Sequence, residues 1–203
     1  TASYIGATYD PDNSKVVIAY TDDDTGDYGQ AVVGTVSGNT ITFGTPVTFA
    51  SAATWDVVVT YDTNSEKVIA YRDAGNSYYG TAIVGTVSGD SISFGSEVVY
   101  ESANAAKQSI AFDSNLNKIV VAYVDYGNSQ YVTAAVGTVS GTSISFGTPV
   151  IVYNGGASGD STGTTFDSNS NKIVINYKTG GGSGESRVGT VSGTSISFGT
   201  AAA

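Results

Sequence analysis

Residues 136–147 read Val136-Gly-Thr-Val-Ser-Gly-Thr-Ser-Ile-Ser-Phe-Gly147, and closely similar stretches occur three more times in the 203-residue chain. Their first glycines are Gly34, Gly85, Gly137 and Gly189, at intervals of 51, 52 and 52 residues. Self-similarity at a fixed period of this length is the signature of a repeat architecture. We therefore expect one repeat domain over 1–203, with units at roughly 1–50, 51–102, 103–154 and 155–203. Because the chain opens at Thr1 without Met and its last unit lacks a counterpart of 149–153, we expect a slice of a longer protein.

The third unit shows most clearly how one repeat is divided into four short strands by recurring turn residues. The expected strands are a at 108–112, b at 118–123, c at 132–139 and d at 143–146. Asp113-Ser-Asn-Leu-Asn117 is expected to form a tight turn, because Asp and Asn side chains bond nearby backbone and tolerate left-handed conformations. Strand b is continuously apolar, which predicts burial on both faces. Strand d alternates polar and apolar residues, which predicts one solvent-exposed face.

Four short strands per unit favour an all-β fold, a β-propeller of four-stranded antiparallel blades, in which each small sheet packs face to face on its neighbours. The alternative is a β-solenoid, whose coil would be shorter and would not need a half-exposed strand at every fourth place. No helix of useful length is predicted, because Gly and Ser-Gly pairs interrupt every helix-period apolar pattern.

Composition excludes several classes of function. The chain contains no Cys and no His, so thiolate catalysis, Cys-ligated zinc and the commonest general base are absent. Its net charge of −10 opposes binding to nucleic-acid phosphates, and no apolar stretch is long enough for membrane insertion. The carboxylates are scattered over turns, linkers and loop tips rather than paired for general acid and base work, so we expect no enzyme and no catalytic residue.

The repeats also resemble a known group of sequences. Units of the form Gly-Thr-Val-Ser-Gly-Thr-Ser-Ile-Ser-Phe-Gly-Thr-Pro-Val, as at 137–150, are joined by Asp-Ser-Asn-Ser-Asn-Lys, as at 167–172. This pattern is similar to the tandem repeats of predicted β-propellers in marine bacterial surface proteins and marine phage structural or tail-associated proteins. The resemblance implies an extracellular, cell-surface or virion location and a role in scaffolding or adhesion. It assigns no functional residue.

The connections between strands differ in how strictly they repeat. The a-to-b and c-to-d turns barely change, whereas the b-to-c and d-to-a connections vary, and in a meander these two sets lie on opposite faces. Tyr and Asn side chains on the variable face are suited to weak, multivalent binding of a cell-surface glycan or protein. The candidate ligand-binding residues are Tyr28, Asn76, Tyr78, Tyr79, Tyr126, Asn128, Tyr131 and the one tryptophan, Trp55.

The predicted binding face and the predicted role of Trp55 each have an alternative interpretation. Loop tips also vary when nothing constrains them, and Trp55 could fill a gap between blades instead of stacking on a ligand. The whole chain could be a purely structural repeat of a fibre or particle, whose partners are other subunits and which has no ligand.

The sequence predicts a metal-binding site on an acidic loop that includes Asp22, Asp24 and Asp27, in which Gly26 permits a tight turn. Calcium prefers several carboxylate or carbonyl oxygens on such a loop, so calcium is a possible cofactor. The spacing is not that of an EF-hand, and a solvated acidic hairpin tip is the simpler interpretation. No other cofactor is predicted.

Overall fold

Each repeat folds as a meander of antiparallel strands, as its alternation of apolar runs and turn residues predicts. The computed structural model describes residues 1–63 and 67–203, apart from the side chains of 67–74 and 158–161, and over these residues the fold is all-β with one short 3₁₀ helix, η1 (Asp23–Thr25). The strands are β1 Ala2–Asp10, β2 Lys15–Asp22, β3 Tyr28–Ser37, β4 Thr40–Phe43, β5 Val47–Asp62, β6 Lys67–Ala74, β7 Tyr79–Ser88, β8 Ser91–Phe94, β9 Val98–Asp113, β10 Lys118–Asp125, β11 Tyr131–Ser140, β12 Ser143–Phe146, β13 Val150–Tyr153, β14 Ala157–Asp167, β15 Lys172–Thr179, β16 Gly184–Ser192 and β17 Ser195–Phe198.

The expected strand order within a repeat is present, and strand d at 143–146 coincides with β12. The first strand of a repeat is much longer than expected, because β9 begins at Val98 and not near residue 108. Its first residues pair with β7 of the preceding repeat, as in Ala82↔Val98, and its last residues pair with β10, as in Lys118↔Asp113. β5 behaves in the same way, so the first three repeats share one hydrogen-bonded sheet, whereas β14 to β17 form a second sheet.

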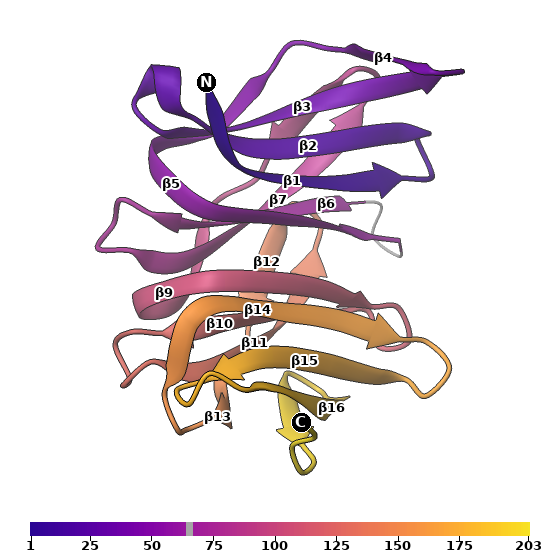
Figure 1. The fold of residues 1–203 in the computed structure, drawn as a ribbon. Coiled ribbons are helices and arrows are strands. Elements are labelled where there is room, and N and C mark those ends of the chain that lie inside the picture. Colours follow the sequence, from indigo (N-terminus) through magenta and orange to yellow (C-terminus); the bar gives the residue numbers. More distant parts are fainter. Residues whose placement is uncertain (64–66) are drawn as a thin grey trace.

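The repeats stack one on the next, with the first at the top of Figure 1 and the fourth at the bottom. Their first strands β1, β5, β9 and β14 lie side by side. Each hydrophobic cluster is shared by two neighbouring repeats: one joins Val17 and Val33 to Ile83 and Ile92, and the others lie between the second and third and between the third and fourth repeats. Burying one such aliphatic side chain contributes about 1.5–3 kcal/mol, so stacking supplies the main stabilisation of every repeat.

The recurring motif residues meet within each repeat. A β-carbon at Gly137 would lie 2.8 Å from Cε1 of Phe146 and 2.9 Å from Cδ1 of Ile144. The glycine on strand c therefore leaves room for the Ile and Phe side chains of strand d, which fold back over it. Gly141 has φ +59°, which makes the tight c-to-d turn possible without strain.

The a-to-b turns form as the sequence predicts. Oδ1 of buried Asp113 accepts hydrogen bonds from the backbone N–H groups of Asn115 and Leu116, both at 3.0 Å, and Asn117 adopts φ +55°. Asp10 and Asp167 make the same side-chain turn in their repeats. The corresponding turn of the second repeat at 62–67 lies partly outside the described residues. Strand b of the third repeat, β10, is buried over nearly its whole length, as expected.

Candidate functional site

The variable connections lie on one edge of the stack. In Figure 1 the a-to-b turns point to the right, and the b-to-c connections lie at the left. We call the left edge the connection face: it consists of the b-to-c connections at 22–28, 74–79, 125–131 and 179–184 and the crossovers at 50–55, 101–106 and 154–157. The four predicted strands per repeat therefore place the two sets of connections on opposite edges.

Backbone hydrogen bonds brace the connection face in the same way between successive repeats. Thr54 N–H donates to the carbonyl of Asp27 at 2.8 Å, Ala105 N–H to that of Tyr78 at 3.1 Å, and Ala157 N–H to that of Gln130 at 2.8 Å. The three accepting residues have φ of +64°, +62° and +59°. In the second and third repeats each follows another left-handed residue, Ser77 or Ser129, which gives the geometry of a type I′ turn. Each connection is therefore fixed to the next repeat.

Two of the predicted ligand-binding residues meet on this face. The rings of Trp55 and Tyr78 stack, with centroids 4.8 Å apart and planes 29° from parallel. Together with Ala53, Gly75 and Ser77 they line a mostly apolar cavity of about 200 Å³, which we call the aromatic recess. Tyr78 remains 42% exposed, so its ring is accessible from solvent. Gly75 N–H donates to the carbonyl of Ala53 at 2.7 Å and joins the two walls of the recess.

The fold does not require this aromatic pair. The backbone positions of Trp55 and Tyr78 are taken by Ser3 and Asp27 in the first repeat. In the third repeat they are taken by Ala106 and Gln130, on the same hydrogen-bonded framework. The recess is therefore a local addition to a common scaffold.

The remaining candidates are distributed along the connection face and do not converge on the recess, although Asn76 and Tyr79 flank Ser77 and Tyr78 in the same turn. Tyr28, Tyr79 and Tyr131 each begin strand c of their repeat and are half-buried. Asn76 and Asn128 open the turns, and their carbonyls accept from Tyr79 N–H at 3.1 Å and Tyr131 N–H at 3.0 Å. Tyr126 is 39% exposed.

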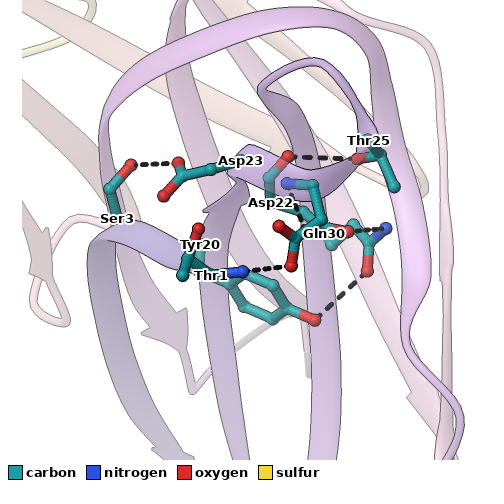
Figure 2. Close-up of polar contacts among 8 residues, drawn as sticks. Thr1, Ser3, Tyr20, Asp22, Asp23, Thr25 and Gln30 are labelled. Atoms are coloured by element: carbon teal, nitrogen blue, oxygen red, sulfur yellow. Dashed lines mark hydrogen bonds and ion pairs between the residues drawn. The ribbon is translucent and has the colours of Figure 1, made fainter.

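The acidic loop of the first repeat is held by donors of the protein itself (Figure 2). Asp22 caps η1, accepting from Asp24 N–H at 3.2 Å, and its other oxygen accepts from Nε2 of Gln30 at 2.9 Å. The Thr1 amino group pairs with Asp24, and Ser3 Oγ donates to Asp23 at 2.8 Å. Within residues 1–63 and 67–203, no three acidic side chains gather in a way that could hold a metal ion. Asp22, Asp24 and Asp27 are not brought together, and calcium binding there stays a prediction.

A buried acidic group lies behind the connection face in the third repeat. Tyr123 is fully buried and donates its hydroxyl to Oε2 of Glu101 at 2.8 Å. Burial raises the pKa of Asp125, and the neighbouring Glu101 carboxylate raises it further, while Gly127 N–H donates to Oδ1 of Asp125 at 2.9 Å. The Asp125 carboxylate thus holds the start of the b-to-c connection in place, while burial of its negative charge opposes folding.

A second depression was not predicted from the sequence. Tyr4, Asp56 and Lys107 occupy equivalent places in β1, β5 and β9, where the pairing with strand b shifts register, and their φ values are +48°, +51° and +57°. These bulges line a cavity of about 270 Å³, together with Ile5, Val57, Val58 and Gln108. Lys107 N–H donates to Oδ2 of Asp56 at 3.2 Å, and Oε1 of Gln108 is buried without a hydrogen-bond partner among the side chains that the structure describes. The three residue types share no chemistry, so repeat comparison gives no signal for the bulge.

Comparisons with known proteins describe the fold and no more. No protein-family model and no curated protein sequence matches the chain. The chain is similar to the crystal structure of AofleA from Arthrobotrys oligospora, with a TM-score of 0.63 and 10% identity, over 98% of this chain and 57% of that one. A mutant of AofleA with three arginines replaced by alanine gives a TM-score of 0.64 at 12% identity, with the same coverage. The chain thus spans little more than half the length of these proteins. No helix in the described part of the chain has the length and apolar content needed to cross a bilayer.

Proposed function

We propose that the chain is part of a β-propeller that acts as a non-catalytic recognition module and binds a glycan or protein weakly through its connection face. The stacking of four-stranded antiparallel repeats supports a propeller over a solenoid, because the strands of one repeat pair chiefly with each other. The three substituted arginines of the AofleA mutant are evenly spaced at an interval close to the repeat length here, which suits a shared repeat organisation.

The aromatic recess is the observation that carries this proposal. It combines a stacked Trp55–Tyr78 pair, an accessible ring face and a frame of backbone hydrogen bonds that keeps both walls in place. Rigid aromatic side chains lose little conformational entropy on binding, and a pre-formed site avoids the cost of ordering a loop. A cavity of about 200 Å³ suits one sugar ring or one apolar side chain of a protein partner.

The distribution of carboxylates supports a non-catalytic role. Besides the aromatic recess and the cavity at the bulges, the described part of the chain has a depression of about 550 Å³ between β5, β9 and β14. Among the residues that line these three cavities, Asp56 is the only carboxylate. Glycoside hydrolysis without His or Cys needs two carboxylates across one bond. Binding without reaction is therefore the chemistry that these cavities support.

The proposed setting is extracellular, on a cell surface or on a virion, and the proposed partner is a surface glycan or protein. The similarity of the repeats to those of marine surface and phage proteins supports this setting. The second candidate is a purely structural repeat of a fibre or particle. The uncovered apolar surface of the first repeat, described below, favours that role.

The test is a glycan and surface-protein array probed with the wild-type chain and with Tyr78→Ala. We expect wild type to bind a restricted set of ligands and Tyr78→Ala to lose at least ten-fold in affinity. Tyr126→Ala is the matched control, since Tyr126 is an exposed tyrosine on the same face outside the recess. Equal binding by all three chains would contradict the proposed site, and no binding by wild type would favour the structural role.

A further inference from the structure

The outer surface of the first repeat carries apolar side chains that later repeats bury. Tyr9, Val36, Ile41 and Phe43 are 56%, 56%, 40% and 51% exposed, and we call them the leading face. Three of their counterparts in the second repeat, Tyr61, Val87 and Ile92, are 6%, 7% and 3% exposed, because they pack on the first repeat. The leading face therefore has the apolar side chains of a packed interface but is exposed to solvent. Ile41 and Phe43 belong to β4, which lies at the top of Figure 1.

The fourth repeat carries the complementary surface at the other end of the stack. Its trailing face consists of Asn176, Ser186, Val188 and Gly199. Val188 is 49% exposed, whereas the matching Val33, Val84 and Val136 are at most 1% exposed under the following repeat. The cross-strand pair Asn176↔Ser186 takes the place of the buried alanine pairs Ala19↔Ala31 and Ala122↔Ala134. Asn176, Ser186, Val188 and Gly199 are small or medium residues and leave room for a leading face, whereas Lys178 takes the place of the buried Thr21 and Val124 at the rim of the trailing face.

One backbone contact fixes how neighbouring repeats meet. In each of the first three repeats, the glycine after strand d lies against a carbonyl oxygen in the c-to-d turn of the next repeat. A β-carbon on the glycine would be about 2 Å from that oxygen: 1.9 Å for Gly44 and Asp90, 1.8 Å for Gly95 and Thr142, and 2.0 Å for Gly147 and Thr194. Gly199 is the fourth glycine of this series, and a β-carbon there would meet nothing closer than 3.8 Å. Asn39 is the fourth turn residue, and it is exposed. Asn39 of the first repeat and Gly199 of the fourth repeat thus have the residue types and positions of the two halves of one more contact of this kind.

We propose that the leading face of one copy of this chain docks on the trailing face of a second copy, with the carbonyl of Asn39 over Gly199 of its neighbour. This contact continues the interface that joins the repeats within the chain. It is heterologous, because two different surfaces meet, so it leads to a ring if the rotation closes and to an open array if it does not. The Asn176–Ser186 pair becomes buried and lowers the affinity compared with an internal interface, so association depends on concentration.

Sedimentation velocity over a range of protein concentrations tests the proposal with one variant on each face. Val36→Lys places a charge on the leading face, and Gly199→Val places side-chain atoms where the Asn39 carbonyl would lie. Both sites are open in the single chain, so both variants are expected to fold, which circular dichroism checks. We expect wild type to form dimers and larger species, and each variant to associate at least ten-fold more weakly. Leu116→Lys alters an exposed apolar residue away from both faces and should associate like wild type.

Mixing the two variants gives the sharpest result. Each retains one functional face, so an equimolar mixture should form a one-to-one dimer that grows no further. A wild-type chain that stays monomeric at every concentration would overturn the proposal. So would a Gly199→Val chain that associates like wild type, because that result would show that two leading faces pack on each other.

Discussion

The carbonyl oxygen of Thr142 lies directly over Gly95, so close that a β-carbon on Gly95 would be 1.8 Å away from it. This relationship explains why a Phe-Gly step recurs in every repeat. The Phe fills the space within its own sheet, and the Gly lets the next repeat approach. The stacking of the repeats therefore depends on the missing side chain as much as on the apolar ones.

Gly95→Ala should destabilise the fold, because the methyl group forces the second and third repeats apart. We expect the free energy of unfolding in urea to fall by about 1–3 kcal/mol, the range typical of overpacked interiors. Gly199→Ala is the control, since its β-carbon would meet only the Val188 carbonyl at 3.8 Å. Equal stabilities of the two variants would show that the repeats do not pack as described.

Asp113→Ala should also destabilise the chain, through the a-to-b turn. The substitution removes the buried Asp113 carboxylate, which accepts hydrogen bonds from the backbone N–H groups of the exposed residues Asn115 and Leu116. A hydrogen bond to a charged group contributes about 1.5–3 kcal/mol and water replaces part of it at an exposed turn, so we expect a loss of about 1–3 kcal/mol. Asp113→Asn keeps Oδ1 and should recover most of this loss. If Asp113→Asn were as unstable as Asp113→Ala, the turn hydrogen bonds would not be the cause.

Asp125→Asn should stabilise the protein at neutral pH. Burial first, and then the Glu101 carboxylate, raise the pKa of Asp125 in the folded state. A carboxyl with a raised folded-state pKa adds stability below its ordinary pKa, and this stability is lost as the pH rises through the raised value. The amide carries no charge and keeps the acceptor for Gly127 N–H, so we expect a gain in stability at pH 7 that shrinks below about pH 4, the ordinary pKa range of an Asp carboxyl. Thermal melts across this range would show a constant difference if ionisation were irrelevant.

Trp55→Ala separates a ligand site from a gap-filling role. If Trp55 only completes a stacked pair on the surface, its removal should lower stability by about 0.5–1.5 kcal/mol. Tyr123→Ala, at a fully buried ring, should cost about 3–5 kcal/mol. A similar loss for both variants would mean that Trp55 supports the packing of the repeats and is not placed there for binding.

Much of the architecture can be predicted from the sequence because turn chemistry and apolar runs recur at the same places in each repeat. The Asp113 turn, the buried strand β10 and the short strand β12 all follow from local patterns. The length of β9 does not, since residues 101–107 contain Ala, Ser and Asn and read as a linker. They are extended only because they cross from one repeat to the next. The left-handed bulge at Lys107 shifts the alternation and hides the continuity further.

The candidate site could be predicted as a face but not as a cavity. Trp55 and Tyr78 are 23 positions apart in the sequence, and they meet because Gly75 bonds to Ala53 across the start of the connection. The sequence equally suggests Tyr28 and Tyr131, which begin strand c in their repeats and lie away from the recess. Comparison of equivalent positions distinguishes the two groups. Tyr28, Tyr79 and Tyr131 recur, whereas Trp55 and Tyr78 occur once.

Binding of a ligand in the aromatic recess should change the fluorescence of Trp55, which is the only tryptophan in the chain. A ligand identified on the array is titrated into wild-type protein and into Tyr78→Ala. We predict a saturable change in the intensity or wavelength of Trp55 emission in wild type, with a midpoint equal to the dissociation constant measured independently by calorimetry, and a much weaker response in the variant. An emission spectrum that stays unchanged while calorimetry shows saturation would place the ligand outside the aromatic recess and contradict the proposed site.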